Sequence, residues 1–118
     1  MPKKVVNIFS VEENFSVPML FEGQEIEFTL RKLPGGTKYK VLNECINIRS
    51  DGATEIDFGA YAIKMLSLMI VDNPTTGGIL TEEQVFNLRP EILEQLEVFL
   101  PKVGSVDNPK IQELLKKA

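Results

Sequence analysis

Apolar and polar residues alternate along one early segment of the chain. Ile26, Phe28 and Leu30 stand at every second position, and the residues between them are glutamate and threonine. A period of two places one set of side chains on each face of a β-strand, so that one face is buried and the other meets water. We therefore predict a strand over residues 24–33, which ends at the proline and glycines of residues 34–36.

The residues before this strand follow no single period. Residues 17–21 are a candidate hairpin partner, joined to the strand through Glu22 and Gly23. A short apolar stretch over residues 4–9 is a second candidate strand. Residues 1–22 are therefore either a strand-forming arm or a mobile arm, and the sequence leaves both alternatives open.

The clearest helical pattern begins after Asp57, whose side chain suits an N-cap. Apolar residues then recur with helical spacing and form one broad stripe, so we expect this helix at the centre of the core. The segment Asp72-Asn73-Pro74 should stop it, because the residue before a proline disfavours the helical conformation. The stripe consists of Phe58, Tyr61, Ala62, Met65, Leu66, Met69 and Ile70.

Residues 37–49 carry a mixed pattern. Leu42 and Cys45 follow helical spacing, whereas Ile46 and Ile48 alternate as they would in a strand. We favour a helix over the whole segment.

Cap signals mark further helices towards the C-terminus. Thr81 and Gln84 have the spacing of a capping box and predict a helix through Leu88. Pro90 suits a first helical turn and begins a helix that Pro101 should end. A last short helix is expected where residues 108 and 109 read Asn-Pro.

The order of these elements, with strands first and helices afterwards, predicts an α+β fold. An N-terminal antiparallel hairpin is followed by a helical C-terminal part, with residues 37–118 mainly helical. A chain of 118 residues can bury one real core but has no room for two ordinary domains. We assign residues 1–118 to a single domain.

Charge and hydropathy narrow the range of partners. The net charge is −4, and residues 51–100 hold nine acidic residues against two basic ones, a local net charge of −7. An acidic region of this kind repels phosphate backbones, so we expect no nucleic-acid binding. The longest apolar run, residues 65–71, is far shorter than the roughly 20 residues that span a bilayer as a helix, so we expect no membrane attachment.

Candidate catalytic chemistry is sparse. The chain contains no histidine, which removes the commonest general base and the commonest metal ligand. Its single cysteine, Cys45, fits a reducing compartment and is expected to be a buried apolar residue. We assign no catalytic, cofactor-binding or metal-binding residue, expect no enzyme, and leave the protein-binding face unknown. The carboxylates considered for acid–base or metal chemistry, and interpreted instead as solvated surface, are Glu82, Glu83, Glu91, Glu94 and Glu97.

Five features follow one another between residues 24 and 101. They are the strand 25–33 with its glycine turn, the helix from Asp57 through Tyr61, the segment Ile70-Val71-Asp72-Asn73-Pro74, the segment Leu80-Thr81-Glu82-Glu83 leading to Leu88, and the helix that Pro90-Glu91-Ile92-Leu93 begins. In this order the sequence resembles the tail assembly chaperones of long-tailed bacteriophages and related prophages. The resemblance covers about two thirds of the chain.

The resemblance implies an assembly factor in the cytoplasm of the bacterial host. Such a protein binds the tape measure protein, helps recruit tail tube subunits, and is not expected in the mature virion. We expect homo-oligomerisation along the client. One alternative is a structural phage protein of the tail or the head–tail junction, and a more remote one is an enzyme that uses carboxylates alone.

Overall fold

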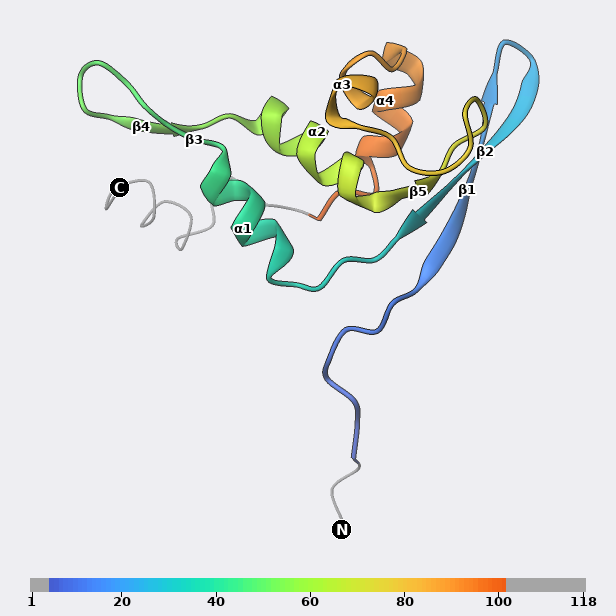
Figure 1. The fold of residues 1–118 in the computed structure, drawn as a ribbon, viewed down its shortest axis with the longest axis horizontal. Helices are drawn as coiled ribbons and strands as arrows, with labels where there is room; N and C mark the ends of the chain where they lie inside the picture. Colours follow the sequence, from blue (N-terminus) through green and yellow to red (C-terminus); the bar gives the residue numbers. More distant parts are fainter. Residues whose placement is uncertain (1–4, 102–118) are drawn as a thin grey trace.

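The computed structural model describes residues 5–101, which form an α+β fold. The chain enters it through an antiparallel hairpin of β1 (Asn14–Phe21) and β2 (Gln24–Arg31) (Figure 1). Glu22 and Gly23 connect the strands with φ values of 51° and 77°, because the tight turn that matches strand twist needs positive φ. The predicted hairpin is confirmed, and its first strand begins three residues earlier than expected.

One face of the hairpin is buried, as the alternating pattern predicts. Phe28 and Leu30 of β2 are at most 3% exposed, and Val17 and Met19 of β1 lie beside them on the same face. The short strand β5 (Ile70–Asp72) pairs with β2 on the side away from β1, which gives the sheet order β1-β2-β5.

Helix α2 (Phe58–Met69) lies between two clusters of buried residues, so its predicted stripe is divided. Leu66 and Met69 pack with the sheet, whereas Tyr61 and Met65 pack in a second cluster. Phe58, at the start of the stripe, is 55% exposed.

The Asp57 side chain caps α2 by accepting a hydrogen bond of 3.0 Å from the backbone N–H of Ala60, as predicted. The predicted end of the helix is wrong. The chain leaves the helix after Met69, because Ile70 pairs its backbone with Leu30 of β2 and continues as β5.

The prediction of one helix over residues 37–49 is also wrong. Helix α1 (Thr37–Glu44) is followed by β3 (Ile46–Ile48), which pairs with β4 (Thr54–Ile56) as a second, two-stranded sheet. Ile46 and Ile48 lie in a strand because the chain reverses at the Asp51-Gly52 turn, which places residues 54–56 beside them as the paired strand. Residues after 37 are therefore less uniformly helical than expected.

Helices α3 (Glu82–Phe86) and α4 (Pro90–Glu97) complete the described part of the chain. The capping box of Thr81 and Gln84 is present, and Pro90 occupies the first turn of α4. Both helices end before the predicted Leu88 and Pro101. The helix expected after residue 108 lies outside the described residues.

The tip of the hairpin is fastened to the start of α4. The Arg89 guanidinium lies 4.9 Å from the centre of the Phe21 ring and pairs with the Glu22 carboxylate at 3.0 Å. Exposed pairs of this kind contribute little stability on their own, but these two contacts share one guanidinium. They join the hairpin turn to the residue that precedes α4, beside the core in which Ile92 and Leu96 of α4 pack with the sheet.

Residues 5–13 form an arm that extends away from the body (Figure 1). The second strand predicted over residues 4–9 is wrong for residues 5–9, which have no strand pairing within the described chain. Within the predicted 1–22 arm, the strand β1 places the apolar residues Phe15, Met19 and Phe21 on the core, and residues 1–4 lie outside the described residues.

Candidate protein-binding groove

The carboxylates weighed for catalysis are spread over the outer faces of two helices. Glu82 and Glu83 stand in the first turn of α3, where the helix dipole favours acidic residues, and both are exposed. Glu82 pairs with Lys64 of α2 at 3.2 Å, and this hydrogen bond raises the pKa of the Lys64 ammonium. Within residues 5–101 the structure contains no group of three or more acidic or cysteine side chains placed to hold a metal ion.

The three glutamates of α4 follow the same pattern. Glu91, Glu94 and Glu97 are exposed along the helix, on the side away from its buried residues Ile92 and Leu96. The structure therefore agrees with their interpretation as solvated surface.

Cys45 is buried in a small second core between α1 and α2. Its side chain is 3% exposed and lies with Val41, Tyr61 and Met65. Burial raises the pKa of the Cys45 thiol, since an apolar site disfavours the charged thiolate. This confirms the prediction of a buried apolar cysteine.

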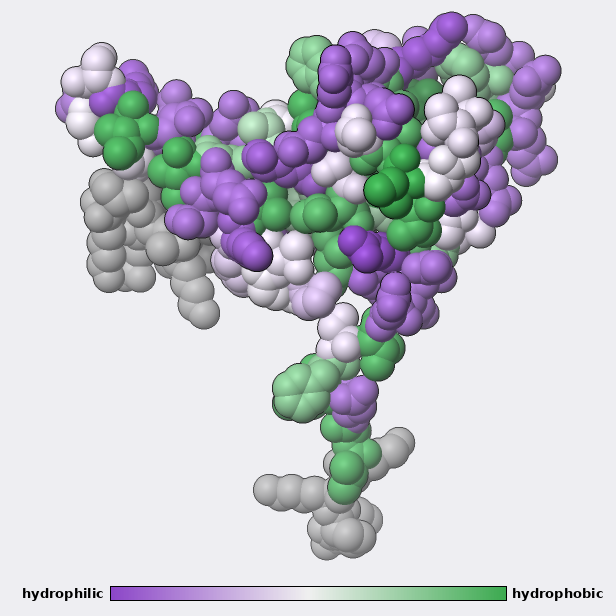
Figure 2. Space-filling model, in the orientation of Figure 1, coloured by the Kyte–Doolittle hydropathy of each residue, from purple (hydrophilic) through white to green (hydrophobic). Residues whose placement is uncertain are grey.

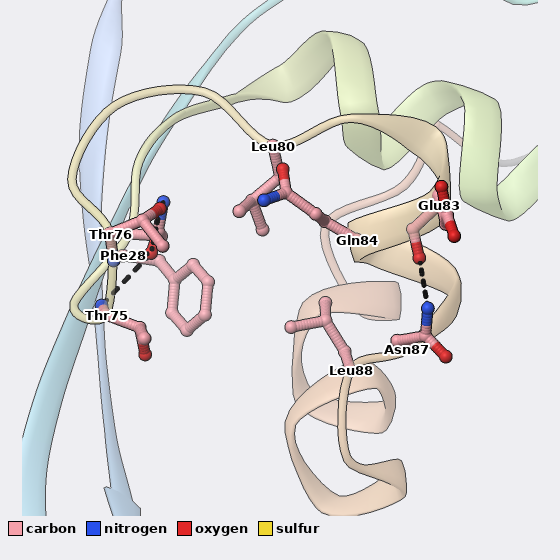
Figure 3. A pocket seen from close by; sticks show the side chains of 9 residues that line it. Phe28, Thr75, Thr76, Leu80, Glu83, Gln84, Asn87 and Leu88 are labelled. Carbon is pink, nitrogen blue, oxygen red and sulfur yellow. Dashed lines mark hydrogen bonds between the residues drawn. The ribbon is translucent and has the colours of Figure 1, made fainter.

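A groove of about 350 Å³ lies between β2 and α3, and we call it the β2–α3 groove. Its floor is apolar, made by Phe28 of β2 together with Leu80 and Leu88 at either end of α3. Figure 3 shows the Phe28 ring between the loop threonines on one side and the two leucines on the other. The volume and the apolar floor suit one or two aliphatic or aromatic side chains.

The loop that forms one wall of the groove is held together by Asn73. This side chain is 5% exposed and is the buried polar residue of the described chain. Its Oδ1 accepts from the backbone N–H groups of Thr75 and Thr76 at 3.0 and 2.9 Å. Its Nδ2 donates to the Thr76 hydroxyl and to the Gly78 carbonyl, each at 2.9 Å. The Asp72 carboxylate adds a further contact by accepting from the Gly78 N–H at 2.8 Å, so the Asn73 amide makes most but not all of the side-chain contacts that hold this wall.

The opposite rim is polar and acidic. The Asn87 amide donates to the Glu83 carbonyl at 2.9 Å, and the Gln84 amide oxygen accepts from the Thr81 N–H at 2.9 Å. The exposed Glu83 carboxylate forms no ion pair within the described residues. An apolar floor beside a free carboxylate suits an apolar side chain that has a basic neighbour.

Apolar side chains are also exposed outside the groove. Figure 2 shows hydrophobic residues along the arm and, interspersed with hydrophilic residues, on the visible face of the body. The hydrophobic pattern alone did not reveal these positions, because an exposed apolar residue and a core residue have the same identity in one sequence. The most exposed are Val5, Ile8, Phe9, Leu20, Ile48, Ile79, Phe86 and Val98, each at least 69% exposed.

No helix of the described residues is long and apolar enough to cross a membrane. Comparison of the chain with known protein families, with curated proteins and with solved structures found no match.

Proposed function

We propose that this protein is a tail assembly chaperone of a long-tailed bacteriophage or prophage. It binds the tape measure protein during virion assembly in the host cytoplasm and helps recruit tail tube subunits. The choice of this family and of this client rests on the resemblance of residues 24–101 to the tail assembly chaperones.

The observation that carries the proposal is the number of large apolar side chains on the surface. Isolated exposed apolar residues are ordinary in a soluble protein, but contiguous ones mark sites of protein–protein contact. In the arm, Val5, Val6, Ile8 and Phe9 are between 64% and 98% exposed within five residues. A protein that covers apolar segments of a client needs such a surface.

The β2–α3 groove supports a particular mode of binding. An amphipathic helix is recognised when its apolar side chains enter a groove with an apolar floor. Phe28, Leu80 and Leu88 provide the floor, and the free carboxylate of Glu83 favours a basic residue beside the apolar anchor. The tape measure protein implied by the resemblance is long and helical, so one chain offers many such anchors.

The proposal is tested by affinity capture from cells that are producing phage. The tagged wild-type chain should recover a very long, helix-rich protein together with a tube-type subunit, identified by mass spectrometry. Recovery of the chain alone would contradict the proposal. If the chain is instead found in purified virions in a fixed ratio to tube subunits, the structural alternative replaces it.

A matched pair of variants sharpens the capture. Leu88 and Leu93 are both half-buried leucines packed on the same core, but only Leu88 lines the groove. Leu88→Gln should lose the long client, whereas Leu93→Gln should retain it, although both variants lose similar stability. Equal loss of the client from the two variants would mean that the groove is not the contact site.

A further inference from the structure

The sheet of β3 and β4 has only two strands within the described chain, and we call it the β3–β4 ribbon. It projects beyond the start of α2, whereas the β1–β2 hairpin lies beyond the end of that helix (Figure 1). Ile56 packs on the small second core around Cys45, but Ile48, nearer the tip, is 79% exposed. A two-stranded ribbon is marginally stable in water unless further strands or a packed face support it. The tip of this ribbon has neither support within the described residues.

The free backbone groups of β3 lie on its outer side. The Arg49 N–H donates to the Ala53 carbonyl at 2.7 Å, and the Cys45 carbonyl accepts at 2.9 Å from the chain that follows β4. Alternate residues of an antiparallel strand face opposite sides, so Ile46 and Ile48 point their N–H and C=O groups away from β4. Neither residue has a backbone hydrogen bond to another described element on that outer side. The outer edge of β3 is therefore open.

The outer edge of the larger sheet differs, because a proline interrupts it. The Lys32 N–H donates to the Glu13 carbonyl at 2.9 Å, so odd-numbered residues of β1 face β2 and even-numbered residues face outward. Pro18 therefore stands at an outward position and offers no N–H there. Proteins commonly protect an exposed edge in this way against pairing with another chain. The strand β3 reads Ile-Asn-Ile and contains neither a proline nor a charge, so its edge is unprotected.

The charges that flank β3 favour an antiparallel pair with a second copy. Glu44 precedes the strand, is exposed and forms no ion pair within the described residues. Arg49 follows the strand, and its contacts with Asp51 and Glu55 are long, at 4.0 and 3.9 Å. When two copies of β3 run antiparallel, the arginine of each lies near the glutamate of the other. A parallel pair would instead bring like charges together, which is destabilising.

The corresponding edge of β4 suits self-association less well. Two copies of β4 paired about their middle residue would place Glu55 directly opposite Glu55 of the second copy. Like charges at directly opposite positions destabilise an antiparallel pair. The middle residue of β3 is Asn47, which carries no charge. Charge therefore selects the β3 edge over the β4 edge.

We propose that β3 pairs antiparallel with β3 of a second copy about a two-fold axis at Asn47, which joins the two ribbons into one four-stranded sheet. Ile46 then lies opposite Ile48 of the second copy, and this pair occurs twice. Each pair exchanges both of its N–H···O bonds, because both residues face the new partner. The exposed Ile48 side chain at each tip is covered by an isoleucine at the base of the other ribbon. This inference goes beyond the proposed function and uses neither the arm nor the β2–α3 groove.

The first test measures the mass of the purified full chain by sedimentation velocity over a range of concentrations. The wild-type chain should approach the mass of a dimer as concentration rises. Ile48→Asp alters two symmetric pairs and should weaken the association about tenfold or more. Ile79→Asp is the matched control, since Ile79 is 73% exposed and lies outside the ribbon, and it should associate like the wild type. A wild-type chain that is monomeric throughout, or an Ile48→Asp variant that associates normally, would overturn the inference.

The second test measures the register by cross-linking. In the proposed pair, Asn47 lies opposite Asn47 of the second copy without ladder bonds, with Cα atoms about 4.5 Å apart. The Glu55 positions of the two copies are three strand spacings apart, about 14 Å, which exceeds the roughly 7 Å that a disulfide can bridge. With Cys45→Ala in both chains, Asn47→Cys should form a covalent dimer on oxidation with copper–phenanthroline, whereas Glu55→Cys should not. Cross-linking at equal rates, or none at Asn47→Cys, would contradict the proposed pair.

The outcome for the client is a separate result. A chain that dimerises through β3 but captures no long client from phage-producing cells would refute the proposed function alone. A chain that captures the client but stays a monomer in both tests would refute the inference alone. If, in that case, Ile48→Asp also loses the client, the open edge binds the client instead of a second copy.

Discussion

Replacement of Asn73 by alanine should destabilise the fold more than its position in a surface loop suggests. Its side chain satisfies three backbone groups, the N–H of Thr75, the N–H of Thr76 and the C=O of Gly78, at 2.9 to 3.0 Å. A hydrogen bond of this kind contributes about 0.5–1.5 kcal/mol net, and a buried group left unpaired costs more. The three losses together predict about 2–4 kcal/mol, a large share of the roughly 5–15 kcal/mol that stabilises a typical domain.

The assay is urea unfolding of the wild type and of three variants. Asn73→Asp keeps the oxygen that accepts from the two amides but loses the donor to Gly78, so it should fall between the wild type and Asn73→Ala. Asn43→Ala is the matched control, because Asn43 is exposed in α1 and should change stability by no more than about 0.5 kcal/mol. If Asn73→Ala is as stable as Asn43→Ala, the account of the loop is refuted.

The remaining predictions concern the core, a helix cap and the thiol. Leu66→Ala should cost about 2–5 kcal/mol in urea unfolding because Leu66 is fully buried in α2, whereas Leu68→Ala on the same helix, 38% exposed, should cost much less. Asp57→Ala should cost about 0.5–2 kcal/mol by the same assay, because the first turn of α2 loses its cap; an unchanged midpoint would contradict this. Cys45 should react slowly with a thiol reagent until the protein unfolds, and rapid native labelling would contradict its burial. Burial raises the pKa of the Cys45 thiol in the folded protein, so the unfolded chain loses this proton at a lower pH than the folded one. The difference in free energy of unfolding between the wild type and Cys45→Ala should therefore be constant below the ordinary thiol pKa of about 8.5. Above that pH the wild type should become less stable relative to Cys45→Ala, until the pH passes the pKa of the folded thiol.

The sequence is sufficient to predict those helices and strands whose local sequence signals agree with the way they pack in the fold. The alternation around Phe28 predicts β2 because one face of the strand meets the core and the other meets water. The caps at Asp57 and Thr81 predict the starts of α2 and α3 because each needs only residues three positions away. These signals are local, so one sequence contains them in full.

The errors arise where a distant partner decides between two local patterns. Ile70 continues the helical stripe of α2 and is fully buried, but it leaves the helix because Leu30, forty residues earlier, offers a strand to pair with. Ile46 and Ile48 similarly become a strand only because residues 54–56 return beside them. The hydrophobic pattern of a short segment does not show which distant segment will pair with it.

The groove could not be predicted for a related reason. In the sequence, Asn73 is part of a stop signal before a proline, and nothing nearby shows that its amide organises the loop up to Gly78. Phe28 and Leu88 are far apart in the chain and meet only through the packing of the sheet on α3. The sequence does not decide between the two alternatives for residues 1–22, because exposed and buried apolar residues have the same identity in one sequence.

The most direct test of the proposed chaperone role is the fate of the client itself. The tape measure protein of the same phage would be produced in bacterial cells with this chain, with the Leu88→Gln variant, and with neither. The account predicts that the client moves from the insoluble to the soluble fraction with the wild-type chain, co-purifies with it, and returns to the insoluble fraction with Leu88→Gln. A client whose solubility is the same with and without the wild-type chain, and that does not co-purify with it, would contradict the account.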